Sequence, residues 1–356
     1  MKVKLGEVAE IIMGQSPDSS SYNYEDGLPF FQGNADFGEY YPTIRILCNK
    51  PKKIANKYDV LISVRAPVGA VNIANNICAI GRGLAIIRTN ANTVNHRYLF
   101  YLLKYHRRYI ENLGTGSTFK AISKPILNDL CFTIHDIQTQ KEIVAVLDKV
   151  TSLISMRKEQ LEKLDILVKS KFIEMFGDPV LNPKGWEKKK LGEVCNVVVG
   201  GDVPLDNFSK EKNEDYNIPI YSNGLAENML YGYTNNARIQ QPCVTVSARG
   251  TIGYCFPHFK PFYPIVRLLC VIPSNNFSIL FLCHQINSIN IKSSGSGVAQ
   301  LTSPMIKSCA LIIPPLDLQN QFAEFVEQVE KNKEKIKSSL NQLETLYSAL
   351  MQEYFG

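Results

Sequence analysis

The sequence lacks the features that mark several common classes of protein. No apolar run approaches the ~20 residues that span a bilayer, and the opening residues, Met1 to Glu7, have no apolar signal core. The nine cysteines include no C-x-x-C pair, so we expect reduced, structural thiols and no zinc site. The five histidines show no metal-ligand spacing, and no catalytic triad or carboxylate pair can be assembled. These absences favour a cytoplasmic protein that binds no metal and has no membrane partner.

Nucleotide-binding glycine motifs are missing as well. The loops Gly114-Thr-Gly116 and Gly295-Ser-Gly297 resemble phosphate cradles, but neither continues to Gly-Lys-Ser/Thr or forms G-x-G-x-x-G. Tight turns are the favoured interpretation. The net charge of +6 permits a nucleic-acid partner without requiring one.

Glycine and proline are also absent from Ile137 to Phe176. Apolar residues recur in this stretch at steps of three and four, which predicts a long helix that packs on another helix. The same pattern returns over residues 318–356. We therefore predict two paired coiled-coil helices. Their interface is expected to include Leu147, Ile154, Leu161, Leu164 and Val168 of the first helix and Ile336, Leu340, Leu343 and Tyr347 of the second.

The two halves of the chain repeat one another. Lys4-Leu-Gly-Glu-Val8 returns as Lys190-Leu-Gly-Glu-Val194, and each copy precedes a β-branched strand that ends in glycine. Segments 60–69 and 244–253 match in the same way, and both long helices end in Phe-Gly. A duplication explains this order. It predicts a first globular domain over 1–136, a helix over 137–177, a second globular domain over 178–317 and a helix over 318–356.

Each half also predicts a shorter helix, over 95–112 and over 277–290. A glycine loop and a final strand follow. The strand then enters the long helix at Ile137-Gln-Thr-Gln140 or at Leu318-Gln-Asn-Gln321.

The order of these motifs, repeated twice, resembles the specificity subunit of a type I restriction-modification system. The resemblance covers both halves and nearly the whole chain. It implies an α+β fold of two pseudo-repeated, mixed but β-rich target-recognition domains. Two long antiparallel coiled-coil helices would join them in a circular, pseudo-two-fold arrangement. It also implies a prokaryotic, cytoplasmic protein that binds double-stranded DNA and two methyltransferase subunits, with motor-nuclease subunits for cutting.

Catalytic motifs of those partners are absent from the chain. It contains no Asn/Asp-Pro-Pro-Tyr/Phe signature of adenine methyltransferases and no helicase or nuclease motif. We expect a non-catalytic subunit of an adenine-N6 DNA methyltransferase and type I endonuclease. S-adenosylmethionine, ATP and Mg²⁺ would be bound by the partner subunits, and none of them by this chain.

Polar side chains in loops at strand ends are the candidates for contacting DNA. Arginine matches the guanine edge, and asparagine or glutamine matches the adenine edge. The candidates are Gln15, Gln32, Asn34, Arg65, Lys120, Asn223, Arg249 and Gln300. Arg65 and Arg249 rank highest because they occupy matched positions, although a recurring arginine could equally hold its turn in place. The basic segment 104–109 favours a solvated helix face over a phosphate contact.

Two readers on a rigid helical spacer predict a bipartite DNA target with two different half-sites. A bivalent protein-binding scaffold without DNA is an alternative, and an enzyme with a site in a strand-end loop is another. Salt-sensitive binding to duplex DNA would separate these hypotheses, because phosphate contacts weaken steeply with salt.

Overall fold

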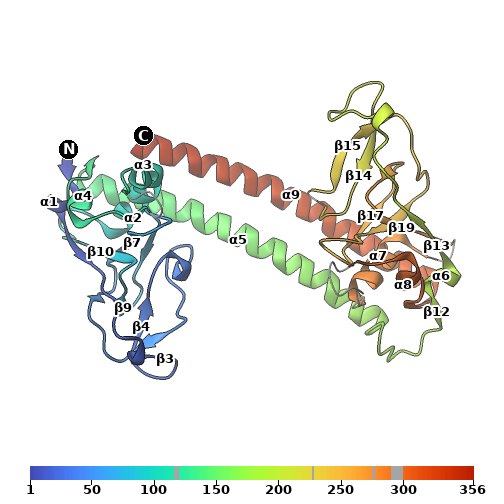
Figure 1. Cartoon of the computed structure of the whole chain (residues 1–356), viewed down its shortest axis with the longest axis horizontal. Helices are drawn as coiled ribbons and strands as arrows, with labels where there is room; N and C mark the ends of the chain where they lie inside the picture. The colour runs from blue at the N-terminus through green and yellow to red at the C-terminus, as the bar shows by residue number, and fades with distance from the viewer. Residues whose placement is uncertain (116–119, 227, 275–276, 290–299) are drawn as a thin grey trace. The chain divides into compact units, whose positions relative to one another are not determined.

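The structure is a computed structural model that describes residues 1–115, 120–226, 228–274, 277–289 and 300–356 (Figure 1). The chain forms two compact units. Unit 1 comprises Met1–Arg157 and Ser339–Gly356, and unit 2 comprises Lys158–Ser338. The long helices are α5 (Ile137–Phe176) and α9 (Leu316–Phe355). Each helix contributes one half to each unit, so the helices are parts of the two units and not separate bodies between the two globular domains.

Unit 1 is built on mostly antiparallel strands covered by short helices, with one parallel pair in its larger sheet. Its four-stranded sheet has the order β2-β10-β7-β8, a five-stranded sheet has the order β3-β5-β4-β9-β6, and β1 pairs with β11. The elements are β1 (Lys2–Lys4), α1 (Leu5–Val8), β2 (Ala9–Met13), β3 (Tyr22–Asn23), β4 (Leu28–Phe31), β5 (Leu47–Cys48), β6 (Ile54–Ala55), β7 (Val60–Ser63), β8 (Val71–Ile73), β9 (Cys78–Ile80), β10 (Leu84–Thr89), α2 (His96–Tyr105), α3 (Arg107–Asn112), α4 (Lys124–Asn128) and β11 (Cys131–Thr133).

Unit 2 repeats this plan, as the duplication predicts. A four-stranded sheet has the order β13-β19-β16-β17, a three-stranded sheet has the order β15-β14-β18, and β12 pairs with β20. The elements are β12 (Lys188–Lys190), α6 (Leu191–Val194), β13 (Cys195–Val199), β14 (Ile218–Tyr221), β15 (Leu230–Thr234), β16 (Cys243–Val246), β17 (Cys255–His258), β18 (Tyr263–Pro264), β19 (Leu269–Pro273), α7 (Ile279–Ser288), α8 (Ser303–Lys307) and β20 (Ala310–Ile312). The α+β class with two β-rich domains is confirmed.

The repeated Leu-Gly-Glu-Val motif forms a single helical turn in each unit, α1 and α6. The carboxylate of Glu7 accepts the backbone N–H of Lys4 at 2.9 Å, as a capping residue does. In unit 1 the glycine allows close packing on α4, because a Cβ on Gly6 would lie 2.8 Å from the Asn128 side chain. The motif therefore ties the first strand of each unit to its last strand.

The first turn of each long helix contains a buried glutamine. Gln140 is fully buried and accepts the N–H of Asn95 at 2.8 Å, and Gln319 is fully buried and accepts the N–H of Ser278 at 3.0 Å. Gln319, and not Gln321, is thus the counterpart of Gln140. The second helix accordingly begins at Leu316, two residues before the predicted position, whereas α5 matches its predicted range.

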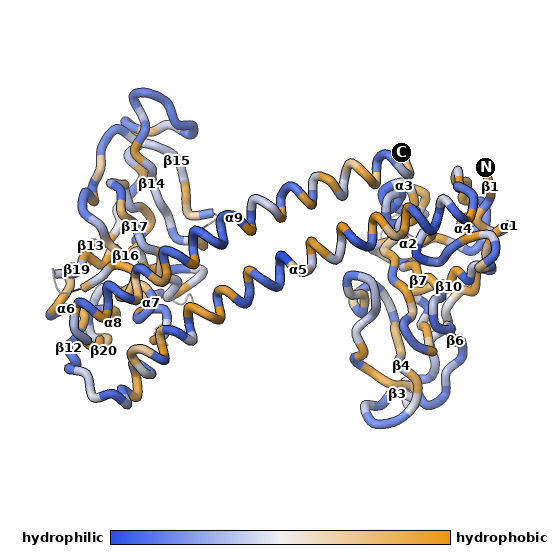
Figure 2. Tube along the Cα trace, turned by 180° about the vertical axis from the view of Figure 1, so that it is seen from behind, coloured by the Kyte–Doolittle hydropathy of each residue, from blue (hydrophilic) through white to orange (hydrophobic). Residues whose placement is uncertain are grey.

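The paired halves of the helices pack within each unit (Figure 2 shows the apolar positions along both helices). In unit 2, Phe172 of α5 contacts Phe322 of α9, and Asp165 pairs with Lys333 at 2.7 Å. Position 165 thus faces 333 while 172 faces 322, which makes this pair antiparallel. Of the predicted interface residues, Leu147, Ile154 and Val168 are buried, and Leu161, Leu164, Ile336, Leu340, Leu343 and Tyr347 are half-buried.

Two shorter helices differ from their predicted ranges. The helix expected over 95–112 is interrupted at His106, whose ψ of 11° separates α2 from α3. The helix expected over 277–290 is α7, shortened at both ends within the described residues. In the part of the chain that the structure describes, no helix combines the length and apolar character needed to cross a membrane.

Candidate functional site

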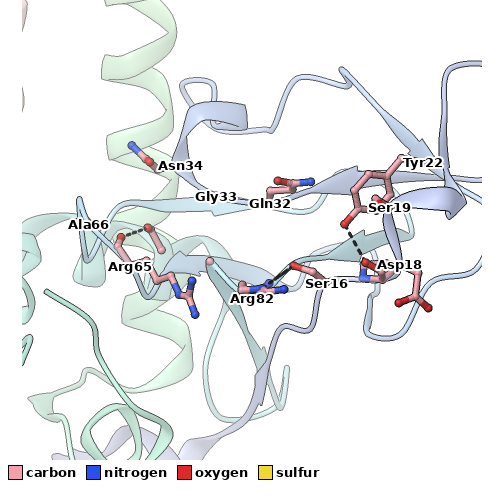
Figure 3. Close-up of a pocket in the computed structure, with 13 residues that line it drawn as sticks. Ser16, Asp18, Ser19, Tyr22, Gln32, Gly33, Asn34, Arg65, Ala66 and Arg82 are labelled. Atoms are coloured by element: carbon pink, nitrogen blue, oxygen red, sulfur yellow. Dashed lines mark hydrogen bonds between the residues drawn. The ribbon is translucent and has the colours of Figure 1, made fainter. Parts of the chain in front are cut away.

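A polar hollow of about 670 Å³ opens in unit 1 where several strand-end loops meet (Figure 3). Gln32 and Asn34 lie along one side of it, and Arg65, Arg82 and Ser16 lie along the opposite side. The remaining lining residues are Pro17, Asp18, Ser19, Tyr22, Gly33, Ser63, Ala66 and Gly83. The hollow combines two guanidinium groups with two carboxamides, which are the side chains suited to base edges.

The Gly81-Arg82-Gly83 turn between β9 and β10 forms one wall of the hollow. A Cβ on Gly83 would lie 2.2 Å from the carbonyl oxygen of Gln32, and a Cβ on Gly81 would lie 3.2 Å from the Cα of Gln32. Only glycine allows this close approach at Gly83. The two glycines thus allow the turn to pack closely against the loop after β4, and Arg82 is exposed between them.

Ser16 holds Arg82 in place. The Ser16 hydroxyl oxygen accepts the backbone N–H of Arg82 at 3.2 Å and its Nε–H at 3.3 Å. On the same side of the hollow, the Ser63 hydroxyl donates to the carbonyl of Arg65 at 2.8 Å and fixes the turn that carries Arg65. Both arginine side chains are exposed. Sequence reasoning missed Arg82 because residue 82 has no arginine counterpart in the second half.

The other candidates of the first half lie at or near the hollow. Gln32 and Asn34 line it, as Arg65 does. Gln15 is exposed and donates its backbone N–H to Ile80 at 3.2 Å, beside the turn but outside the lining. Lys120 is exposed and precedes Ala121, which forms a β-bridge with Arg65. The structure therefore gathers Gln32, Asn34 and Arg65 at one site, with Gln15 and Lys120 at its margin.

Unit 2 contains a turn at the equivalent position, Ile265-Val266-Arg267. Leu84 donates its N–H to Gly81 at 3.0 Å, and Leu268 donates to Ile265 at 3.1 Å. Gly81 donates to Phe31 at 2.8 Å, and Ile265 donates to Tyr221 at 2.9 Å. The parallel pairing of β4 with β9 likewise matches that of β14 with β18. Val266 therefore occupies the place of Arg82, and Arg267 occupies the place of Gly83.

The second turn has a different backbone conformation. Val266 and Arg267 have φ values of 53° and 65°, a region that β-branched residues rarely adopt. At the equivalent position of unit 1, a Cβ would strike the neighbouring backbone. A side chain at position 267 therefore excludes the first turn's geometry, and the left-handed turn replaces it.

Asn223, a candidate DNA contact, connects this turn to the segment that follows β16. Its Nδ2 donates to the carbonyl of Val266 at 2.7 Å, and its Oδ1 accepts the N–H of Ala248 at 2.7 Å. In unit 1 the equivalent N–H, that of Val64, is satisfied by the carbonyl of Gly83 at 2.9 Å. The two bonds give Asn223 a structural role in unit 2.

Gly33 replaces Asn223 in unit 1 and leaves its hollow open. A Cβ built on Gly33 meets no atom within 4 Å. The remaining candidates of unit 2 lie together, because Arg249 donates to the side chain of Gln300 at 3.3 Å. A separate hollow of about 640 Å³ adjoins Arg249 and is lined by residues 250–254 and 287–289.

Aromatic rings pack around the buried His258 in unit 2. This imidazole stacks on Phe262 at 4.5 Å, lies 4.7 Å from the ring of Tyr221, and bonds to Thr245 at 3.0 Å. Burial lowers the pKa of His258 to about 4, so it is neutral at pH 7. Within the described ranges, no three His, Cys, Asp or Glu side chains gather in a metal-binding cluster. Gly116, Gly295 and Gly297 of the glycine loops lie outside the described residues.

Comparison with known proteins identifies the family. The model of the type I restriction modification DNA specificity domain matches residues 1–165 and 183–345. A putative type I restriction enzyme MjaX specificity subunit of Methanocaldococcus jannaschii is 46% identical over 157 residues, which are 44% of this chain and 37% of that protein. The chain thus matches little more than a third of that relative's length. A putative type I specificity subunit, S.MpnORF89P of Mycoplasma pneumoniae, is 30% identical over 267 residues, which are 72% of this chain and 79% of that protein.

Solved structures show the same fold. The type I restriction-modification S subunit from M. genitalium superposes with a TM-score of 0.70 at 16% identity, covering 100% of this chain and 96% of that one. A chain from a structure of type I restriction-modification complex assembly superposes with a TM-score of 0.60 at 16% identity, covering 100% and 97%. The family match spans both halves, and each half contains the polar strand-end loops described above. The chain therefore belongs to the type I restriction-modification DNA specificity family, with one target-recognition domain in each half.

Proposed function

We propose that this chain selects the DNA sites of an adenine-N6 methyltransferase complex, each target-recognition domain reading one half-site of a bipartite, asymmetric target. The polar hollow of unit 1 carries this proposal, because it joins Arg65 and Arg82 to Gln32 and Asn34 in one exposed place. The equivalent loops of unit 2 present Arg249, Gln300 and Val266. Since the two sets differ in chemistry, the two half-sites differ in sequence.

The long helices would fix the spacing of the two half-sites. α5 is one uninterrupted helix of 40 residues, a length of about 60 Å at 1.5 Å per residue. A rigid spacer of this kind suits two readers that must meet DNA in a fixed helical register.

α5 would also dock the methyltransferase subunits through six exposed apolar residues.

 Three of the exposed apolar residues of α5 lie in unit 1 (Val146, Leu153 and Met156) and three lie in unit 2 (Ile166, Leu167 and Ile173). Each is at least 38% exposed. Exposed apolar side chains on a helix that already packs through its other face favour a protein partner. S-adenosylmethionine, ATP and Mg²⁺ would then be bound by the partner subunits, in the cytoplasm of a prokaryote.

A methylation map tests the DNA-reading role. The chain is expressed with its methyltransferase subunit in a strain without adenine methylation, and the modified adenines are located by sequencing. We expect one motif of two short half-sites separated by a fixed gap. Methylation that is identical without this chain would contradict the proposal and favour the scaffold alternative.

The docking role needs its own variants. Leu153→Glu and Leu167→Glu place charges on the exposed apolar positions, and Ser152→Glu and Ser170→Glu place the same charges on exposed neighbours. The leucine variants should lose the methyltransferase subunit in size-exclusion chromatography, while the serine variants retain it. Equal retention by all four variants would exclude α5 as the docking surface.

A further inference from the structure

We propose that the turn after β9 and the turn after β18 each carry a base-selecting residue: Arg82 selects a guanine in the first half-site, and Val266 contacts a thymine methyl group in the second. This inference rests on the proposed DNA-reading function. It assigns a specificity role to two residues that sequence reasoning did not select.

The positions are equivalent because the surrounding backbone is equivalent. Gln15 donates its N–H to Ile80 at 3.2 Å, and Gly201 donates to Pro264 at 3.2 Å, one residue before each turn. Gly14 donates to Leu84 at 2.9 Å, and Gly200 donates to Leu268 at 2.8 Å, one residue after each turn. The same frame therefore presents a guanidinium group in one domain and an isopropyl group in the other.

Arg82 is preorganised for bidentate binding. Its Nε is engaged by Ser16, which leaves the Nη1 and Nη2 groups as the free end of the fork. Neither group donates to a residue that the structure describes, and Figure 3 shows the side chain along the wall of the hollow. A fork held at its base matches the O6 and N7 acceptors of guanine in the major groove. Because Ser16 already orders the side chain, less rotamer entropy is lost on binding.

Val266 is exposed in a strained conformation. Its side chain is 42% exposed, and its φ of 53° is one that glycine or asparagine adopts more readily. The backbone is held on both sides, because the N–H of Val266 donates to Gly201 at 2.8 Å and its carbonyl accepts from Asn223. Strained residues that a rigid surrounding holds in place tend to cluster at functional sites. An exposed isopropyl group offers apolar contact, which in the major groove is suited to the C5-methyl group of thymine.

The Arg82 assignment is tested by the methylation map of variant complexes. Arg82→Ala should replace one guanine of the first half-site with a degenerate position, and Arg82→Lys should do so in part because it keeps the charge but loses the fork. Ser16→Ala should weaken discrimination at the same position. Arg108→Ala, which removes an exposed charge from α3 outside the hollow, should leave the motif unchanged. An unaltered motif in the Arg82→Ala complex would overturn the assignment.

The Val266 assignment is tested with duplexes in which deoxyuridine replaces single thymines of the second half-site. One replacement should weaken binding by the wild-type complex about 5-fold, in line with the ~1 kcal/mol of a modest base contact. The Val266→Gly complex should bind both duplexes equally. If no thymine replacement distinguishes the two complexes, the Val266 assignment is wrong. A wild-type complex that yields no motif at all would instead contradict the proposed function.

Discussion

Asn223 does in unit 2 what a peptide carbonyl does in unit 1. The buried N–H of Ala248 bonds to the Asn223 side chain, whereas the N–H of Val64 bonds to the carbonyl of Gly83. The difference follows from one residue of the turn, since Arg267 stands where Gly83 allows a tight backbone approach. A single side chain thus changes both the turn and the residue that supports it.

Replacing Asn223 by alanine should destabilise unit 2 by about 1–3 kcal/mol, because the N–H of the fully buried Ala248 loses its acceptor. Denaturant unfolding measures the loss. Gln32→Ala, a carboxamide deletion at an exposed position of unit 1, is the matched control and should change stability little. Equal stability of the Asn223→Ala variant and the wild type would contradict the structural role.

The pH dependence of stability should reflect His258. Its pKa of about 4 in the folded chain lies below the ~6.5 of an exposed imidazole, so the unfolded state binds more protons between these values. The free energy of unfolding should be largest above pH ~6.5 and should fall by up to about 3 kcal/mol as the pH drops to ~4. Burial also lowers the pKa of His284 to about 4, which adds a second contribution of the same sign.

His258→Phe isolates the first contribution, since phenylalanine keeps the ring among Tyr221 and Phe262. Unfolding curves from pH 4 to pH 7 should show a smaller slope in this variant than in the wild type. His284, His96 and His106 supply the remainder, because burial lowers the pKa of each of them. A slope equal to that of the wild type would show that His258 is protonated equally in the folded and unfolded states.

At the same scale, the sequence predicted some of the site and missed the rest for a physical reason. Arg65, Gln32 and Asn34 are polar residues directly after apolar strands, and the structure gathers them at one hollow. Arg82 was not predicted because the search favoured residues that recur in both halves, and the residue equivalent to Arg82 in unit 2 is Val266. The role of Asn223 depends on the left-handed turn at residues 266–267, and no local sequence pattern predicts that turn.

At the scale of elements, periodicity was the strongest guide. The apolar steps and the absence of glycine and proline predicted α5 over its full range, and the same pattern placed α9 within two residues of its start. The interruption between α2 and α3 at His106 was not predictable, because the sequence there contains no glycine or proline and the break lies in one backbone angle. Tertiary contacts decide such local features.

The buried face of α5 in unit 2 should carry most of the helix's contribution to stability. Phe172 is 2% exposed among the rings of Phe176, Phe281 and Phe322. Phe172→Ala should cost about 3–5 kcal/mol. Its neighbour Ile173 is 48% exposed, so Ile173→Ala should cost less than about 1 kcal/mol. Thermal unfolding of the two variants compares the faces, and similar losses would mean that the helix is not seated as described.

At the scale of the whole molecule, the end of the chain packs against residues that are far from it in sequence. Met351 and Phe355 of α9 belong to the core of unit 1, together with Tyr98 and Leu147. The Phe355 ring lies 5.3 Å from that of Tyr98, across more than two hundred residues of sequence. The duplicated order of domain and helix predicted this return of the second helix to the first domain.

Phe355→Ala should therefore loosen unit 1 and leave unit 2 intact. A cavity in this core should cost about 3 kcal/mol or more, seen as faster amide exchange in β2 and β10 and unchanged exchange in β13 and β19. Glu353→Ala, an exposed position two residues away, is the control. Loss of protection in both units together would show that they unfold as one.

The discontinuity of unit 1 also sets an order of events during synthesis. Unit 2 is a single stretch, Lys158–Ser338, and the ribosome completes it before it supplies Met351 and Phe355 to unit 1. Domains usually fold in the order in which they emerge from the ribosome. Here unit 1 begins to emerge first, but its core is completed last. Until then, the core face of Leu147 and Tyr98 lacks its final cover. A chain released after residue 338 would contain a complete second unit and an incomplete first one.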